Sequence, residues 1–124
     1  MKSQTKEMTM PLIQIKTNVM LPEKQREARL APISRLLAEI TRKPETYVMV
    51  TYEQAAVLFA GEPGAAAFVD VRGIGGLNRE VNAKLSAALA VELKKLLGIP
   101  PDRLYLTFTE VAATHWGWNG ELFG

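Results

Sequence analysis

The sequence contains no cysteine and only one histidine, His115. Without thiols the chain can form no disulfide and no cysteine-ligated metal site, and thiol redox chemistry is excluded. A single histidine also excludes the usual multi-histidine zinc site. We therefore expect neither a metal nor a cofactor, and any chemistry must use other groups.

Long apolar runs and a strong charge bias are missing as well. No stretch approaches the roughly 18 apolar residues that a membrane-spanning helix needs, and residues 1–10 lack the apolar core of a signal peptide. A cytoplasmic protein without a membrane partner is expected. The 15 Lys and Arg against 13 Asp and Glu give a net charge of +2, and the basic residues are scattered along the chain. We expect no nucleic-acid partner, because this distribution forms no basic patch.

A length of 124 residues suits one domain of ordinary size. Strands are expected at 11–18, 47–53, 66–71 and 103–110, where β-branched and aromatic residues are concentrated. One helix is expected from Pro22 to the stop at Lys43-Pro44, and another from the cap at Asn78 to Gly98, since apolar residues recur there at helical spacing. Residues 1–10 are interpreted as a disordered or non-native leader, and residues 11–124 as the domain.

The two halves of this domain repeat one another. Segments 44–53 and 100–110 each follow a helix and contain a proline, a short polar turn and a strand that ends in Thr, an aromatic residue and Glu. A duplicated β-α-β unit predicts an α/β domain of the α+β type, with a four-stranded mixed sheet and both helices on one face. Alternating apolar residues on the other face would leave an exposed patch, which association with further copies would cover.

Several residues could carry chemistry, and each has a structural alternative. The loop Gly73–Gly76 precedes a helix and could bind an anion, but it does not match a dinucleotide motif and a tight turn is the simpler interpretation. Asp70, Glu53 and Glu110 fall at strand ends and could be general bases or solvated charges. The two tryptophans of segment 115–119 could line a pocket or pack in a core or subunit interface. These patterns alone assign no function.

Five segments, in order and at nearly constant spacing, resemble the macrophage migration inhibitory factor family of the tautomerase superfamily. They are Met10–Val19, Thr41–Tyr47, Gly75–Asn78, Pro101–Tyr105 and Trp116–Asn119. The resemblance implies a homotrimer with active sites between subunits. It also implies keto–enol tautomerisation of small α-keto acids, of the phenylpyruvate or dopachrome type, without a cofactor. Its base would be an amino-terminal proline, here Pro11.

The resemblance also assigns substrate-binding residues, position by position. Lys43 matches a lysine that pairs with the substrate carboxylate, and Val71 matches a residue whose backbone amide helps to bind the substrate. Tyr105 matches an aromatic residue that enters the site from a neighbouring subunit, and Thr107 stands where the animal protein has an asparagine in the pocket. The apolar pocket residues are matched by Trp116 and Phe123.

Two departures from the family pattern bear on function. The Cys-x-x-Cys segment of the animal protein falls near 63–66, which contains no cysteine, so a thiol oxidoreductase activity is not expected. Residues 1–10 make Pro11 internal, and an internal proline has no basic nitrogen. Translation from Met10 with removal of that methionine would free the amine. The alternative is a non-catalytic, cytokine-like relative that binds or signals with Pro11 blocked.

Overall fold

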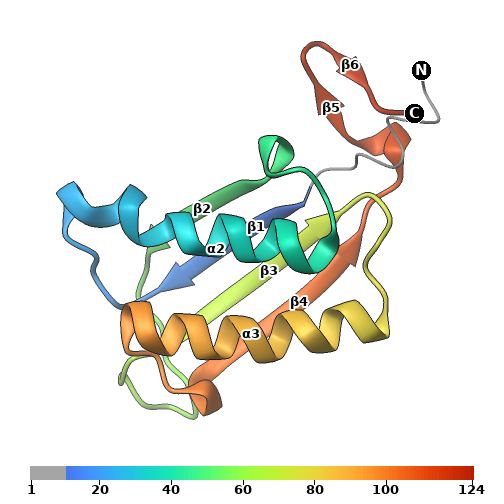
Figure 1. The fold of residues 1–124 in the computed structure, drawn as a ribbon. Helices are drawn as coiled ribbons and strands as arrows, with labels where there is room; N and C mark the ends of the chain where they lie inside the picture. The colour runs from blue at the N-terminus through green and yellow to red at the C-terminus, as the bar shows by residue number, and fades with distance from the viewer. Residues whose placement is uncertain (1–10) are drawn as a thin grey trace.

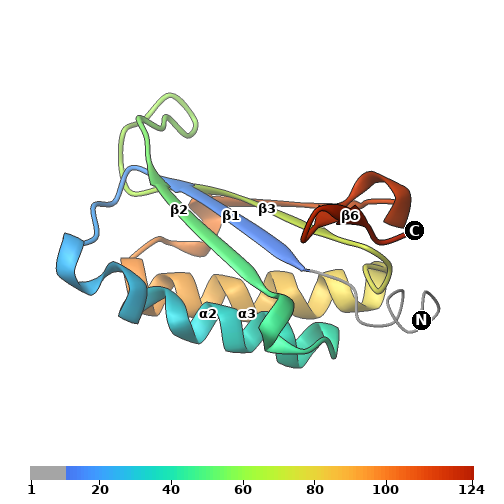
Figure 2. The ribbon, with the colours of Figure 1, turned by 90° about the horizontal axis from the view of Figure 1, so that it is seen from above.

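The computed structural model describes residues 11–124, and the expected leader at 1–10 lies outside the described residues. Four strands form one sheet in the order β2-β1-β3-β4. Two helices, α2 and α3, lie side by side on one face of this sheet (Figures 1 and 2). This arrangement confirms the expected α+β fold. The bounds are β1 Leu12–Thr17, α2 Arg26–Thr41, β2 Met49–Gln54, β3 Ala67–Gly73, α3 Arg79–Leu97 and β4 Leu104–Glu110.

The duplication predicted from the sequence appears in the strand pairing. Strand β1 is parallel to β2, and β3 is parallel to β4. The two units join through the antiparallel pair β1 and β3. The registers also correspond, because Gln14 faces Thr51 in the first unit and Asp70 faces Thr107 in the second.

The core lies between the sheet and the two helices. On α3, Leu85, Leu89 and Leu93 are fully buried because their four-residue spacing puts them on one face of the helix. Each contributes about 2 kcal/mol through burial. The strands supply the opposite wall with alternate residues, including Ile13, Ile15, Val69 and Val71.

Both helices end in the same way. The residue after each helix is left-handed, Arg42 with φ 58° and Gly98 with φ 71°. A proline and a short 3-10 turn follow, η2 at Glu45–Tyr47 and η3 at Pro101–Arg103. The strands after them therefore begin later than expected. Among residues 11–124, no helix combines the length and apolarity needed to cross a membrane.

The start of the first helix also differs from the expectation. The segment after Pro22 first forms a 3-10 turn, η1 at Glu23–Gln25, and α2 begins only at Arg26. No side chain caps this start, whereas the Asn78 side chain at the start of α3 accepts a hydrogen bond from Val81 N at 2.9 Å. The expected cap at Asn78 is confirmed.

The sheet face away from the helices is not the apolar patch expected from the sequence. Exposed apolar side chains on it are Met49, Phe68 and Tyr105, with exposures of 60%, 40% and 65%. Polar residues separate them, because they occupy most of the outward positions of all four strands. These polar residues are Gln14, Lys16, Thr51, Glu53, Asp70, Arg72, Thr107 and Thr109.

A small hairpin follows the sheet and was not expected from the sequence. It comprises η4 (Ala113–His115), β5 (Gly117–Trp118) and β6 (Glu121–Leu122). Its turn is made by Asn119 and Gly120, both with positive φ. Figure 1 shows the hairpin at the end of the sheet where β1 begins.

Candidate active site

Pro11 lies directly before the central strand β1, at the end of the sheet that carries the hairpin. It is buried, and its carbonyl accepts a hydrogen bond from Met49 N at 3.1 Å. Proline lacks an amide hydrogen, so the first position of a strand is one of the few that it can occupy. This hydrogen bond therefore fixes the backbone of Pro11 beside Met49, the first residue of β2.

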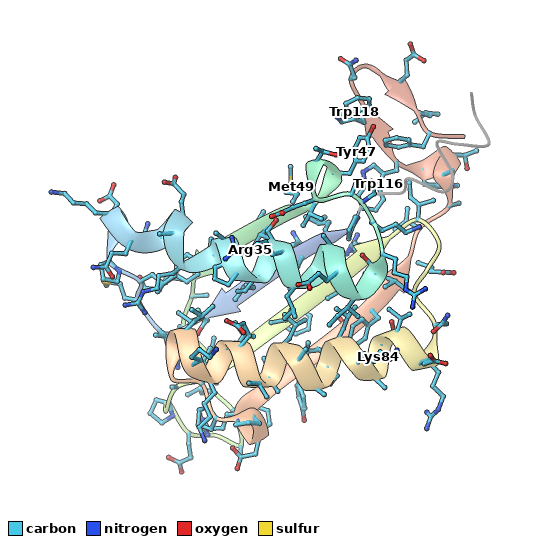
Figure 3. All side chains as sticks on the ribbon, in the orientation of Figure 1. Arg35, Tyr47, Met49, Lys84, Trp116 and Trp118 are labelled. Atoms are coloured by element: carbon cyan, nitrogen blue, oxygen red, sulfur yellow. The ribbon has the colours of Figure 1, made fainter. Side chains whose placement is uncertain are left out.

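A cavity of about 300 Å³ opens beside Pro11. This volume is at the lower end of the range for small-molecule sites. Its wall is mainly aromatic and aliphatic, and Figure 3 shows Tyr47, Trp116 and Trp118 gathered between η2 and the hairpin. The lining residues are Pro11, Leu12, Thr46, Tyr47, Val48, Met49, Trp116, Gly117 and Trp118.

Ring contacts hold the hairpin against this cavity. Tyr47 meets Trp118 edge-on with centroids 5.7 Å apart, and Trp118 stacks on Phe123 at 6.0 Å. Such aromatic pairs contribute about 0.5–1.5 kcal/mol beyond burial. Phe123 N also donates to the Trp116 carbonyl at 3.2 Å. Phe123 is buried behind Trp118 and does not line the cavity, so in this protomer it supports the wall rather than forming it.

Lys43 follows the left-handed end of α2, and its amide donates to the Ala38 carbonyl at 3.1 Å. A Cβ placed on Gly76 would lie 3.4 Å from Lys43 Cε and 3.7 Å from Lys43 Nζ. The lysine side chain therefore lies across Gly76. Two residues earlier, Ile74 forms a small buried cluster with Phe123, and Tyr47 and Trp116 of the wall pack against this cluster. Through this small cluster the loop that carries Gly76 is attached to the cavity, although Lys43 is not a lining residue.

The loop Gly73–Gly76 takes the form of a tight turn. Gly75 and Gly76 have φ values of 71° and 81°, a region that other residues rarely adopt. These values support the simpler of the two interpretations given for this loop.

The remaining site residues expected from the sequence lie elsewhere in the protomer. Val71 is buried in β3 between Ile13 and Phe108 of the adjacent strands. Tyr105 and Thr107 lie on the uncovered face of the edge strand β4. None of the three lines the cavity beside Pro11. Of the expected site residues, one protomer therefore places Pro11 and Trp116 in the cavity wall and Lys43 on the nearby loop at Gly76. It does not bring the other expected residues to the cavity.

Asp70 is engaged in a hydrogen-bond network on the uncovered face. Its carboxylate accepts from Thr107 Oγ1 at 2.6 Å and from Arg72 Nε at 2.7 Å. Burial raises the pKa of Asp70, but the Thr107 hydrogen bond and the Arg72 guanidinium together outweigh it and lower the pKa below the usual 3.8. A weakly basic carboxylate of this kind is a poor general base near neutral pH.

The other carboxylates do not converge on the cavity either. Glu53 is exposed on β2, and Glu110 Oε2 accepts from Leu77 N at 3.3 Å. Among the residues that the structure describes, no group of three His, Asp or Glu side chains could hold a metal ion. Neither Glu53 nor Glu110 lines the cavity beside Pro11.

Sequence reasoning assigned no site role to six lining residues, namely Leu12, Thr46, Tyr47, Val48, Met49 and Gly117, and left Trp118 open between a pocket and a packing role. Trp118 had a usable signal, because an Asn-Gly pair such as Asn119-Gly120 is typical of a hairpin turn. A hairpin would have placed both tryptophans on one small unit next to the sheet. Thr46 and Tyr47 lie in the turn η2, Val48 and Met49 come directly after it, and no local pattern indicated that this turn faces Pro11.

The family model described as macrophage migration inhibitory factor matches residues 10–124. A homolog from Trichinella spiralis is 35% identical over 115 residues, which cover 92% of this chain and 100% of that protein. A homolog from Trichuris trichiura is 34% identical over 116 residues, covering 92% and 100%.

Solved structures agree with this result. The macrophage migration inhibitory factor homologue from Prochlorococcus marinus superposes with a TM-score of 0.86 at 35% identity, and the match covers 91% of this chain and 99% of that one. The Toxoplasma gondii protein gives a TM-score of 0.85 at 32% identity, with 90% and 98% covered. The chain belongs to the macrophage migration inhibitory factor family of the tautomerase superfamily.

Proposed function

We propose that this protein is a keto–enol tautomerase of small α-keto acids and that the Pro11 amine is its general base. One observation carries the proposal: Pro11 is buried at the edge of a cavity with aromatic walls. The family model also begins to match at residue 10, directly before this proline. Pro11 becomes basic only as the first residue of the chain, so the proposal includes a protein that begins there.

The chemistry needs a base that is neutral near physiological pH. A secondary amine at Pro11 would be surrounded by Leu12, Val48 and the tryptophans, which disfavours its protonated form. The amine would take a proton from the carbon next to the substrate carbonyl and leave an enolate. The resulting ammonium would then return the proton to the oxygen and produce the enol. The reverse sequence converts the enol to the ketone.

The substrate class follows from the surroundings of the cavity. Lys43 would pair with the substrate carboxylate, and its ammonium lies beside Gly76, 3.7 Å from the position that a Cβ would take there. The backbone amide of Val71 would be a second donor to that carboxylate. Trp116 and Trp118 would receive an aromatic or apolar group. An α-keto acid with an aromatic side chain, such as phenylpyruvate, meets these requirements.

Assembly would complete the site. Tyr105 and Thr107 are exposed on β4 and do not reach the cavity of their own protomer. In a homotrimer with sites between subunits, they would contribute to the cavity of a neighbour. Light scattering tests this assembly, and the expected mass is three times that of the chain.

The decisive experiment compares three proteins in phenylpyruvate tautomerisation, followed by the ultraviolet absorbance of the enol. The first begins at Pro11, the second keeps residues 1–10, and the third is Pro11→Gly in the Pro11-first chain. Loss of a general base lowers the rate by about 10²- to 10⁴-fold, so we expect only the first protein to be active. Lys84→Ala, on α3, is the control for a surface substitution (Figure 3).

The result also separates catalysis from a binding function. Equal rates in all three proteins would overturn the proline mechanism. No activity from a chain whose intact mass proves that it begins at Pro11 would instead favour a binding or signalling protein. The intact mass of the protein made from its native gene shows which form the cell contains.

A further inference from the structure

The loop between β2 and β3, residues 55–66, lies at the end of the sheet opposite the hairpin (Figures 1 and 2). Its tip is a two-residue turn. Phe59 and Glu62 exchange backbone hydrogen bonds of 3.0 and 2.9 Å, and Ala60 and Gly61 between them have φ values of 55° and 75°. Positive φ at both central residues is the geometry of a type I′ turn, which is unfavourable for alanine. Contacts from outside the turn are needed to stabilise it.

Arg103 supplies these contacts. Its Nη1 donates to the Phe59 carbonyl at 3.3 Å, and its Nη2 donates to the carbonyls of Glu62 and Gly64 at 2.9 Å each. Its Nε donates to the Ala65 carbonyl at 2.9 Å. One planar guanidinium therefore holds four carbonyl groups of the loop. A lysine could not span them, because its donors radiate from a single atom.

Asn18, at the end of β1, fixes the same loop from the other side. Its Nδ2 donates to the carbonyls of Pro63 and Gly64 at 3.1 and 3.0 Å. Its Oδ1 accepts from Ala66 N at 3.0 Å. The loop therefore has a defined position relative to both β1 and β4.

The consequence of this clamp is the position of one aromatic ring. The Arg103 guanidinium lies 5.6 Å from the centroid of the Phe59 ring. The Phe59 ring also contacts the Tyr105 ring, with the two ring centroids 4.9 Å apart. In the single protomer Tyr105 is 65% exposed, and its ring is held against the ring of Phe59.

We propose that Arg103 and Phe59 are positioning residues that hold the Tyr105 ring ready for the active site of a neighbouring subunit. The inference rests on the proposed function, in which Tyr105 acts in that site. An unrestrained tyrosine would lose rotational freedom when the substrate binds, and this loss weakens binding. Holding the ring beforehand lowers KM, while Pro11 still sets the rate of proton transfer.

The test is a double-mutant cycle on KM and kcat in the Pro11-first protein. Phe59→Leu keeps the apolar bulk and removes the ring, and we expect it to raise KM by about three- to tenfold, the range of one aromatic pair. In the Tyr105→Ala background, Phe59→Leu should have no further effect on KM. Equal effects in both backgrounds, or an unchanged KM in the single variant, would overturn the proposal.

Further variants keep the test informative if Phe59→Leu folds poorly. Phe59→Tyr retains a ring and should keep the KM of the unsubstituted protein, whereas Arg103→Lys should raise it. The matched control is Arg26→Lys, because the Arg26 guanidinium also lies 5.6 Å from a ring, that of Tyr52. Since Tyr52 hydrogen-bonds to Val19 and Leu21, we expect no change in KM. An equal rise in both lysine variants would contradict a specific role for Arg103.

Mixed trimers distinguish failure of this inference from failure of the proposed function. Subunits carrying Pro11→Gly, mixed with subunits carrying Tyr105→Ala, should recover active sites, because an intact proline then meets an intact tyrosine. If activity does not recover, the proposal that the active site is shared between subunits is wrong. If activity does recover, Phe59→Leu subunits should regain the KM of the unsubstituted protein in the same way when mixed with Pro11→Gly subunits. If KM stays raised in those mixtures, Phe59 does not act through Tyr105.

Discussion

At each end of the sheet, a left-handed residue, a proline and a 3-10 turn lead from a helix into an edge strand. In the first unit this path delivers Tyr47 and Met49 to the cavity beside Pro11. In the second unit the equivalent positions are Arg103 and Tyr105, which contact the loop between the two units. The backbones correspond closely, since the residues before the two turns have φ and ψ of −63°, 135° and −64°, 141°.

The comparison shows how a duplicated unit can serve two purposes. The first end surrounds a potential base with an apolar wall. The second end exposes the Tyr105 side chain, which the ring of Phe59 contacts. If the protein assembles as proposed, these ends meet across subunit boundaries, and one complete site needs the first end of one protomer and the second end of another.

Of the two ends of the sheet, the end with Pro11 should show the larger loss of catalytic activity when it is changed. A protein that keeps Met10 before Pro11 has an amide at this nitrogen, and we expect at least about a 100-fold lower kcat/KM than for the Pro11-first protein. Tyr105→Ala at the second end should mainly raise KM. Steady-state kinetics on both proteins measures this contrast. A Met10-retaining protein of full activity would remove Pro11 from the mechanism.

The two arginine–ring pairs give the next largest difference, this time in stability. Arg103 makes four hydrogen bonds to the loop, whereas Arg26 makes one to the Leu21 carbonyl, at 3.1 Å. We expect Arg103→Ala to lower the free energy of unfolding by about 2–3 kcal/mol, and Arg26→Ala by about 1 kcal/mol or less. Urea unfolding measures both. Equal losses would show that the extra hydrogen bonds to the loop contribute nothing net.

Much of the scaffold was predictable because its signals are local. Alternating β-branched residues marked the strands, and Asn78 and Gly98 marked the ends of α3. The repeat of Pro44 and Pro100 before similar strands indicated the duplication, and the duplication indicated the sheet. Except for the duplication, which compares two halves of the chain, each signal lies within a few residues of the structure that it predicts.

The cavity was less predictable because it joins distant segments. Nothing local to Tyr47 shows that it faces Trp118, and only the folded chain brings η2 to the hairpin. The expected apolar face was wrong for a related reason. The alternation was correct, but the outward residues are mostly polar, such as Gln14 and Asp70. Their partners, including Thr107, lie on other strands.

Substitutions at the starts of the two helices should differ by a smaller amount in their effect on the free energy of unfolding. Asn78 caps α3 through Val81 N, while Gln25 before α2 makes no such side-chain bond. We expect Asn78→Ala to lower the free energy of unfolding by about 1 kcal/mol, and Gln25→Ala to leave it nearly unchanged. Asn78→Ser, which restores a capping oxygen, should recover most of the loss in urea unfolding. No recovery would mean that Asn78 stabilises the protein by another contact.

The smallest expected effect compares equivalent threonines of the two units at acid pH. Thr107 donates to Asp70 at 2.6 Å, while Thr51, which faces Gln14, has only a 3.5 Å contact to the Ile13 carbonyl. The lowered pKa of Asp70 means that its contribution to stability is present above its usual value of 3.8 and is lost as the pH falls through the lower, folded value. Thr107→Val should therefore be less stable than the unsubstituted protein at pH 7, by under about 1 kcal/mol. That difference should narrow as the pH falls below 3.8 and through the lower pKa of Asp70 in the folded protein. Thr51→Val should show no such pH dependence, because its partner does not titrate, and urea unfolding across this range distinguishes the two variants.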